Sequence, residues 1–178
     1  MRFVRLLERP CEARAAVLPV GRRNRAMHLL RRRARNGQPN ATGRPSHQGC
    51  LACQQLGRCV IDDDANAIAR KMEAAEVIVF ATPIYYYEMC GQMKTLLDRL
   101  NPLYKSDYKF RDIYMLATAA DDDAHAIDKA YNGLQGWVDC FEKAELKGYV
   151  FGNGIAEPGD AKNHTETLLD AYNLGKSL

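Results

Sequence analysis

The amino-acid sequence predicts an α/β domain with three layers, in which a doubly wound parallel sheet has helices on both faces. Three short apolar runs, at residues 76–81, 112–118 and 147–152, have the β-branched and aromatic content of strands that are covered on both faces. Segments with apolar residues at helical spacing alternate with these runs. This alternation favours an open parallel sheet, in which ligands bind beyond the carboxyl ends of the strands.

The helical segments are identified by apolar side chains that return every three or four residues. These positions are Ala65, Ile68, Met72 and Ala75, then Met93, Leu96, Leu97, Leu100 and Leu103, and then Ile127, Leu134, Val138 and Phe141. A last helix is expected at 160–174, and Trp137 is expected in the core. Acidic clusters at 62–64 and 121–123 are expected just before or within the first turns of two helices, where carboxylates favour the positive end of the helix dipole.

Length and composition limit the class of protein. With 178 residues, of which 47% are hydrophobic and 26% charged, the chain can form one domain with a sizeable core. It has no apolar run of about 18 residues, and its start lacks the apolar core of a secretory signal. We therefore expect a cytoplasmic protein without a membrane partner, whose six cysteines are thiols, metal ligands or redox groups.

The charge is distributed unevenly along the chain. Residues 1–48 hold 12 Arg, no Lys and two acidic residues, a formal charge of +10, whereas residues 49–178 carry −7. A basic segment can bind nucleic acid or a membrane surface. Because this segment lacks interleaved aromatic residues and a helix that could read bases, a non-enzymatic nucleic-acid-binding protein is an alternative that we do not favour. Residues 31–48 have the composition of a loop, with no evident second strand.

Three consecutive tyrosines follow the first predicted strand. Tyr85, Tyr86 and Tyr87 come soon after Pro83, so we expect them in a loop at the ligand end of the sheet, stiffened by the fixed φ of proline. A flat conjugated cofactor suits this place, because aromatic side chains pack on its rings while backbone groups meet its polar edge. Two alternatives stay open at this point: the rings cap the core, or they form a dimer contact.

Three segments resemble those of the NAD(P)H-dependent FMN reductases of the flavodoxin fold, relatives of the iron–sulfur flavoproteins: GCLACQQLGRCVIDDD, AEVIVFATPIYYYEMCGQMKTLLDRLNPLY and YMLATAADDD. The most specific part is the pattern P-x-Y…G-Q-x-K-x-x-x-D-R, carried by Pro83, Tyr85, Gly91, Gln92, Lys94, Asp98 and Arg99. The resemblance covers residues 49–178 and implies a five-stranded flavodoxin-like sheet, bound FMN, NAD(P)H as the electron donor and a homodimer.

By this resemblance, two segments would contact the flavin ring. The cofactor-binding residues would be Thr82, Pro83, Ile84, Tyr85 and Tyr86 after the first strand and Thr118, Ala119 and Ala120 after the next. FMN would perform the hydride chemistry, and the protein would orient the ring, exclude solvent and tune its potential. The electron acceptor would be a flavin or a small quinone-like or nitroaromatic molecule. No side chain is assigned as a catalytic acid or base, and Lys94 and Arg99 are expected to be solvated or salt-bridged.

Residues 1–48 depart from the family's pattern, so residues 49–178 are predicted as the FMN-binding domain. Family members bind the FMN phosphate through a loop rich in Gly and Ser at a helix N-terminus, and residues 5–20 contain neither. Reading possible codons for residues 8–14 one base later permits NGPAKHG, which resembles that loop. We hypothesise that residues 1–48 are a frameshifted translation. Without two charge-assisted hydrogen bonds to phosphate, FMN affinity would fall by about a hundred- to ten-thousand-fold.

The cysteines support an alternative function. Cys50, Cys53 and Cys59 have the spacing C-x₂-C-x₅-C, and the iron–sulfur relatives carry a fourth cysteine where this chain has His47. The alternatives are an electron carrier with an iron–sulfur centre or a Cys₃His zinc site, whereas the favoured interpretation includes no metal. Cys90 lies in the tyrosine segment and is expected to pack rather than react.

Two weaker signals remain. Residues 121–125 (DDDAH) can be interpreted as a metal site, but a charged helix start explains them without one. Residues 152–154 (GNG) are expected to form a turn after the last strand, at the end of the sheet where a cofactor contact can form.

Overall fold

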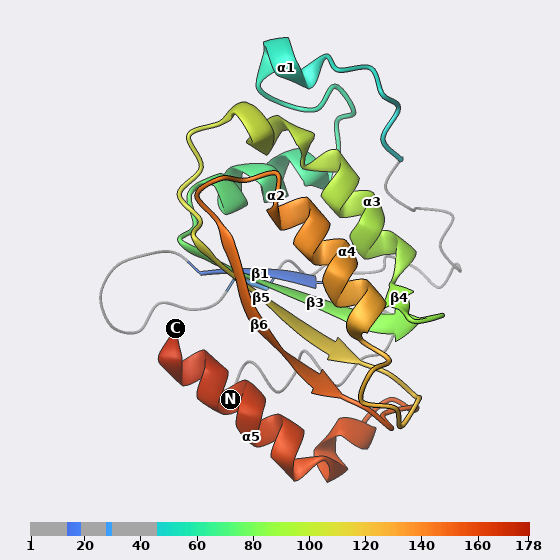
Figure 1. Ribbon diagram of the computed structural model, residues 1–178. Coiled ribbons are helices and arrows are strands. Elements are labelled where there is room, and N and C mark those ends of the chain that lie inside the picture. Colours follow the sequence, from blue (N-terminus) through green and yellow to red (C-terminus); the bar gives the residue numbers. More distant parts are fainter. Residues whose placement is uncertain (1–13, 19–27, 30–45) are drawn as a thin grey trace.

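The computed structural model describes residues 14–18, 28–29 and 46–178 (Figure 1). The elements are β1 (Arg14–Leu18), β2 (His28–Leu29), α1 (Cys53–Leu56), α2 (Asp64–Glu73), β3 (Val77–Tyr85), β4 (Glu88–Met89), α3 (Gly91–Arg99), η2 (Asn101–Lys105), β5 (Asp112–Thr118), α4 (Asp128–Val138), β6 (Glu145–Gly152), η3 (Asp160–Asn163) and α5 (Thr165–Ser177). The predictions about the phosphate loop, the second strand and a frameshift fall mostly outside the described residues.

The strands form a sheet of order β2-β1-β3-β5-β6, with the short β4 paired to β3. The predicted parallel pairing is confirmed for β3, β5 and β6. The first two strands, which the sequence left uncertain, are antiparallel: β1 runs antiparallel to both β2 and β3. The connection from Leu18 to His28 is shorter than the roughly dozen residues that a parallel crossover needs, so β1 and β2 pair as a hairpin.

Helices cover both faces of the sheet, as predicted (Figure 1). Successive side chains of a strand point to opposite faces. In β3, Ile78 and Phe80 therefore belong to the core under α2, α3 and α4. Val79 and Ala81 belong to a smaller core on the other face, where Ala171 of α5 packs. The apolar run of the strand is thus explained by burial on both faces.

Strand β3 continues to Tyr85, four residues beyond the predicted end at Ala81. The proline at position 83 did not end the strand. Among the described residues, pairing between β1 and β3 stops at Ala81 and β5 alone flanks the strand at Pro83, and a proline is tolerated at a position that lacks a partner on one side. The prediction that residues 82–85 belong to a loop is therefore wrong.

Each of the four predicted helices is present and differs from the prediction at its ends, whereas the short α1 was not predicted. Helix α3 ends at Arg99 and is followed by the 3₁₀ turn η2, which contains Pro102. The predicted helix at 160–174 is divided at His164 into η3 and α5. The acidic cluster at 62–64 caps α2 as expected, since Asp63 accepts a hydrogen bond from the amide of Ala65.

Trp137, predicted in the core, is half-buried and packs against the larger core. Its ring centroid is 5.6 Å from that of Phe80 in β3 and 4.5 Å from that of Phe141 after α4. These contacts fix the spacing between α4 and the sheet, which places the loop before α4 next to the carboxyl ends of the strands.

Candidate functional site

The tyrosine segment forms a tight hairpin at the carboxyl end of β3. Tyr85 pairs with Glu88 of β4, so Tyr86 and Tyr87 alone make the turn. Their φ angles are +53° and +65°, which is the left-handed conformation that a type I′ turn needs and that Asn or Gly normally supplies. For a residue with a Cβ atom this conformation costs about 1–2 kcal/mol. The hairpin therefore holds two strained tyrosines.

The exposure of these rings shows whether buried surface offsets the backbone strain of the turn. The side chain of Tyr86 is 99% exposed, and Tyr85 and Tyr87 are each 46% exposed. A fully exposed ring buries no surface within the described chain that could offset its backbone strain. Backbone strain that no buried contact of the same residue offsets is typical of a ligand-binding position.

The structure brings the two predicted ring-binding segments together. Pro83 of β3 and Thr118 of β5 are direct partners in the parallel register, so the segments leave the sheet side by side. The buried members of the predicted site are Thr82, Pro83, Ile84 and Ala119, Thr118 is half-buried, and Tyr85, Tyr86 and Ala120 are exposed. Among these residues, only the last three have exposed side chains that a ligand can contact. The others can offer backbone groups or support.

A third loop meets these two at the same edge. The amide of Ala119 donates to the carbonyl of Gly152 at 2.9 Å, and the amide of Ile155 donates back to the carbonyl of Ala119 at 2.8 Å. The amide of Gly154 donates to the carbonyl of Asp121 at 3.0 Å. The prediction of a turn at 152–154 is confirmed, and the turn is tied to the loop after β5.

Gly154→Ala is expected to lower the free energy of unfolding by about 1–2 kcal/mol. Gly154 has a φ of +65°, and a Cβ atom there would lie 2.4 Å from Oδ1 of Asp122. The matched control is Gly136→Ala in α4, where an added Cβ meets nothing within 4 Å and should stabilise the helix by about 0.5–1 kcal/mol. Urea unfolding of both variants measures the two changes. Equal effects at the two positions would contradict the prediction.

Asp121 accepts hydrogen bonds from two of these segments. The hydroxyl of Tyr87 donates to Oδ2 at 2.9 Å, and the amide of Asp123 donates to Oδ1 at 2.9 Å. Helix α4 begins at Asp128, so the acidic cluster at 121–123 lies before the helix rather than within its first turn, and the carboxylates of Asp121 and Asp123 cap turns of this loop. Within the described residues no group of His, Cys, Asp and Glu is arranged to hold a metal ion.

The hydrogen bonds of Asp121 shift the ionisation of both partners. The pKa of Asp121 lies below its ordinary value of 3.8, chiefly because of the Asp123 amide and then because of the Tyr87 hydroxyl. The pKa of Tyr87 is raised above 10.0, first by its hydrogen bond to Asp121 and then by the charge of that carboxylate. Both shifts favour the hydrogen-bonded pair near neutral pH.

In a base titration, Asp121→Asn is expected to bring the pKa of Tyr87 back toward 10.0, because the substitution removes the negative charge. Because the pKa of Tyr87 is higher in the folded protein than its ordinary value of 10.0, the Tyr87–Asp121 contact contributes fully to stability below pH 10.0. This contribution is lost as the pH rises through the pKa of Tyr87 in the folded protein. Ultraviolet absorbance of phenolate measures the shift, and Tyr87→Phe identifies the signal of this residue. An unchanged Tyr87 titration in Asp121→Asn would contradict the assignment.

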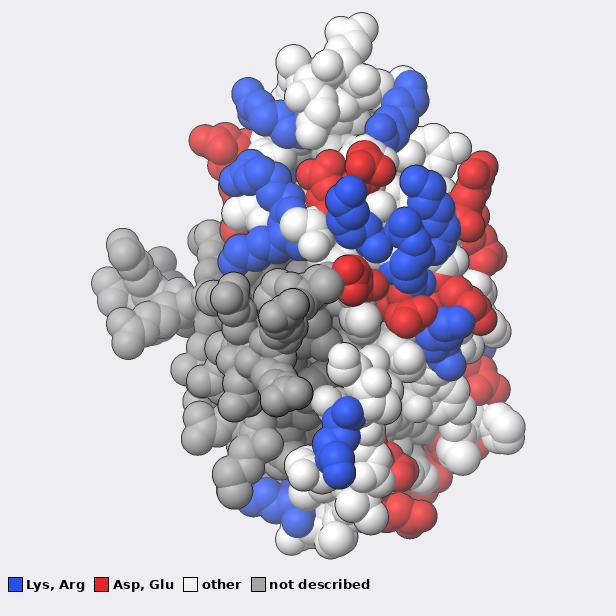
Figure 2. All heavy atoms as spheres, turned by 90° about the vertical axis from the view of Figure 1, so that its left-hand side faces the viewer, with Lys and Arg blue, Asp and Glu red and all other residues white. Residues whose placement is uncertain are grey.

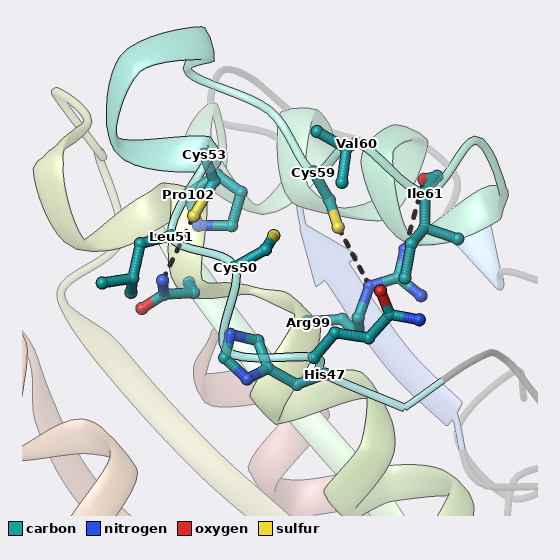
Figure 3. Close-up of a pocket in the computed structure, with 11 residues that line it drawn as sticks. His47, Cys50, Leu51, Cys53, Cys59, Val60, Ile61, Arg99 and Pro102 are labelled. Atoms are coloured by element: carbon teal, nitrogen blue, oxygen red, sulfur yellow. Dashed lines mark hydrogen bonds between the residues drawn. The ribbon is translucent and has the colours of Figure 1, made fainter.

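The three cysteines of the C-x₂-C-x₅-C segment line a small cavity together with His47 (Figure 3). Cys53 Sγ accepts a hydrogen bond from Asn101 Nδ2, and Cys59 Sγ accepts one from Arg99 Nε, each at 3.2 Å. The cavity measures about 20 Å³, which is space for about one water molecule. As arranged, the described residues do not fit an iron–sulfur cluster or a zinc ion.

Arg99 is the largest fully buried side chain of the described residues and holds the cysteine segment in place. Its two terminal nitrogens donate to the carboxylate of Asp63 at 2.9 and 3.1 Å, in bidentate geometry. Burial alone would lower the pKa of Arg99, but the hydrogen bonds that Arg99 donates to Asp63 and Cys59 together outweigh it and raise the pKa. The expected salt bridge is confirmed for Arg99, although it is not solvated, and Lys94 pairs with Asp98 on the surface.

Sequence reasoning missed two features of this architecture. Tyr87 was left out of the predicted site, and Asp121 was assigned to a helix start. Their contact joins residues 34 positions apart, so no local pattern signals it. The same holds for Arg99 and Asp63, which are 36 positions apart.

Comparison with known proteins agrees with the predicted family. The family model described as NADPH-dependent FMN reductase matches residues 37–146. An iron–sulfur flavoprotein of Methanocaldococcus jannaschii is 29% identical over 138 residues, covering 73% of this chain and 70% of the relative. YwqN of Bacillus subtilis, which carries the name of an NAD(P)H-dependent FMN-containing oxidoreductase, is 28% identical over 126 residues, 65% of this chain and 67% of YwqN.

Solved structures show the same fold. The Trp repressor binding protein from Bacillus subtilis has a TM-score of 0.54 at 24% identity, over 62% of this chain and 70% of that protein. The NAD(P)H:quinone oxidoreductase from Methanothermobacter marburgensis has a TM-score of 0.50 at 14% identity, over 68% and 65%. The predicted flavodoxin-like α/β fold is therefore confirmed. The chain belongs to the family of NADPH-dependent FMN reductases and is an FMN-dependent NAD(P)H oxidoreductase.

Proposed function

We propose that this chain binds the ring of FMN at the carboxyl edge of its sheet, between the tyrosine hairpin and the loop after β5, and passes electrons from NAD(P)H to a small acceptor. The observation that carries this proposal is Tyr86, a ring that is 99% exposed in a strained turn. The proposed contacts are Thr82, Pro83, Ile84, Tyr85, Tyr86, Thr118, Ala119 and Ala120. Quinone-like molecules are the proposed class of acceptor.

The residues present at this edge suit a flat conjugated ring. Tyr85 and Tyr86 offer exposed aromatic surface, and Ala120, in the other predicted segment, is an exposed residue with a small side chain. The backbone beneath is held by Thr82, whose Oγ1 accepts a hydrogen bond from the amide of Cys90 at 3.0 Å and donates one to the carbonyl of Pro83 at 2.8 Å. When bound, FMN supplies the hydride and electron chemistry. The chain's part is to bind and orient the ring and to exclude water.

Two ligands that differ only in the phosphate test this site in the full-length chain. Because residues 5–20 contain no Gly or Ser, we expect FMN and riboflavin to bind with similar affinity, whereas two hydrogen bonds from a phosphate loop would favour FMN by about a hundredfold or more. Flavin fluorescence measures both affinities, and bleaching of the bound flavin's absorbance by NADPH or NADH reports the reaction. A variant with residues 1–48 replaced by an intact phosphate-loop segment should gain affinity for FMN alone.

Absence of flavin binding from both proteins would overturn the proposal. The same spectra examine the alternatives. A brown, chelator-sensitive absorbance would support an iron–sulfur carrier, which the names of several relatives suggest. Because the described cysteines do not fit a cluster as they are arranged, we derive no step through one. Cys90 is buried and its amide bonds to Thr82, in agreement with a packing role.

Salt-sensitive DNA binding without a chromophore would support the nucleic-acid alternative. On the face shown in Figure 2, Lys and Arg of the described residues are interspersed with Asp and Glu rather than gathered in one patch. That distribution does not favour a nucleic-acid surface. The Arg-rich segment itself lies outside the described residues.

The finer statements about partner and location are also proposals. No helix of the described residues is long and apolar enough to span a bilayer. We propose a cytoplasmic homodimer, because an exposed tyrosine cluster also suits a protein interface and the described cysteines Cys50, Cys53, Cys59, Cys90 and Cys140 are free. Light scattering at several concentrations measures the oligomeric state. A monomer throughout would contradict the dimer without affecting the flavin site.

A further inference from the structure

Three loops at the carboxyl edge of the sheet meet on one residue, Asp121. Its Oδ2 atom accepts from the hydroxyl of Tyr87 in the hairpin turn at 2.9 Å. Its Oδ1 atom accepts from the amide of Asp123 in its own loop at 2.9 Å, and its carbonyl accepts from the amide of Gly154 after β6 at 3.0 Å. Each oxygen atom of Asp121 thus bonds to a different segment.

Neighbouring contacts strengthen this junction. Asn153 Nδ2 donates to the carbonyl of Asp122 at 2.7 Å, which fastens the loops after β5 and β6 a second time. Lys129 Nζ lies 5.5 Å from the centroid of the Tyr87 ring, so a cation from α4 packs over the same side chain. The junction is therefore anchored to the sheet, and the hairpin is the segment that depends on it.

The hairpin has little intrinsic stability. Strand β4 consists of two residues, and the pairing is limited to Ile84 with Met89 and Tyr85 with Glu88. Isolated hairpins are marginally stable in water, and this one also has two non-glycine residues in the left-handed conformation. An outside contact is needed to keep its turn closed, and the Tyr87–Asp121 hydrogen bond is such a contact.

We infer that Asp121 is a positioning residue for the flavin: by holding Tyr87, it keeps the turn in the conformation that presents Tyr86 to the ring. This inference rests on the FMN site proposed above. Tyr86 and Tyr87 are adjacent, so fixing one restricts the backbone of the other. Apparent ligand affinity falls in proportion to the population of the competent conformation. If opening reduces that population to about one tenth, FMN binds about tenfold more weakly.

The test is a double-mutant cycle on FMN affinity in the full-length chain. Tyr87→Phe removes only the hydroxyl, and Asp121→Asn removes the charge while keeping the size of the side chain. We expect each to weaken FMN binding by about tenfold, and the double variant also by about tenfold rather than a hundredfold, because both changes break the same contact. The matched controls are Tyr104→Phe, in an exposed residue of η2, and Asp107→Asn, whose side chain is 81% exposed. Both should bind FMN like the wild type.

A second readout follows the hairpin in the absence of flavin. Amide hydrogen exchange of residues 85–89 should be faster in Tyr87→Phe and Asp121→Asn than in the wild type, with the β5 core unchanged. Unchanged FMN affinity in the variants, or losses that multiply in the double variant, would overturn the inference. If the variants lose global stability but bind FMN like the wild type, Asp121 has a structural role only. If the wild type itself binds no FMN, the proposed function and the positioning role both fail, and hydrogen exchange still decides whether Asp121 holds the turn.

Discussion

Asp63→Asn is expected to lower the free energy of unfolding by about 3 kcal/mol, since removing the charge of one partner weakens a buried, bidentate ion pair. Arg99 has no exposed side-chain surface, whereas the side chain of Asp63 is 20% exposed, which places the effect at the lower end of the range for buried pairs. The Asn side chain keeps an oxygen that can still cap α2, so the change reports mainly the loss of charge. Urea unfolding monitored by circular dichroism measures it.

The exposed pair between Lys94 and Asp98 is the matched control. These residues lie one helical turn apart on α3, with Nζ and Oδ1 separated by 2.7 Å and both side chains open to solvent. Asp98→Asn should therefore change the stability by less than about 0.5 kcal/mol. Similar losses from the two substitutions would show that burial does not set the strength of the Arg99 pair. The Asp63 variant should also loosen the cysteine segment, because Arg99 Nε binds Cys59.

Tyr86→Asn is expected to stabilise the protein and to weaken FMN binding. Asn adopts the left-handed conformation of a type I′ turn more readily than Tyr, and Tyr86 is 99% exposed, so the substitution removes strain without losing buried surface. The gain should be about 1 kcal/mol, or about 2–4 °C in melting temperature. Loss of an aromatic contact to the flavin should lower the affinity by about tenfold. Thermal melts without flavin and fluorescence titrations with FMN measure the two changes.

A gain in stability together with a loss of FMN affinity would distinguish a binding role of Tyr86 from a structural one. Tyr104→Asn removes another exposed tyrosine, in η2, and should leave FMN affinity unchanged. If Tyr86→Asn binds FMN like the wild type but dissociates a dimer, the ring serves the subunit interface instead. A loss of stability in Tyr86→Asn would show that the turn is not strained as its φ angle indicates.

Local patterns in the sequence were sufficient to place most elements. Strand β5 begins and ends at the predicted residues, because its apolar run is bounded by polar residues on both sides. Asp63 caps α2 as expected, since capping depends on neighbours two or three positions away. The family pattern across Pro83 and Arg99 also lies in one continuous segment. These features were predictable because their causes are close together along the chain.

The end of β3 could not be determined in this way. Pro83 and the tyrosines after it have the local character of a loop, yet the chain stays extended to Tyr85 because β5 and β4 pair with it. Strand pairing is a property of the partner as well as of the segment. The antiparallel direction of β1 has the same origin, since it depends on β2 and β3.

By itself, the sequence determined the alternation of strands and helices and the family to which the chain belongs. Only the tertiary structure decided that Tyr86 and Tyr87 form a strained turn, that Tyr87 donates a hydrogen bond to Asp121, and that Arg99 is buried against Asp63. The physical reason is the range of the interactions. Periodicity and capping act within one or two helical turns, whereas these contacts join side chains 34 and 36 positions apart that meet only when the sheet assembles.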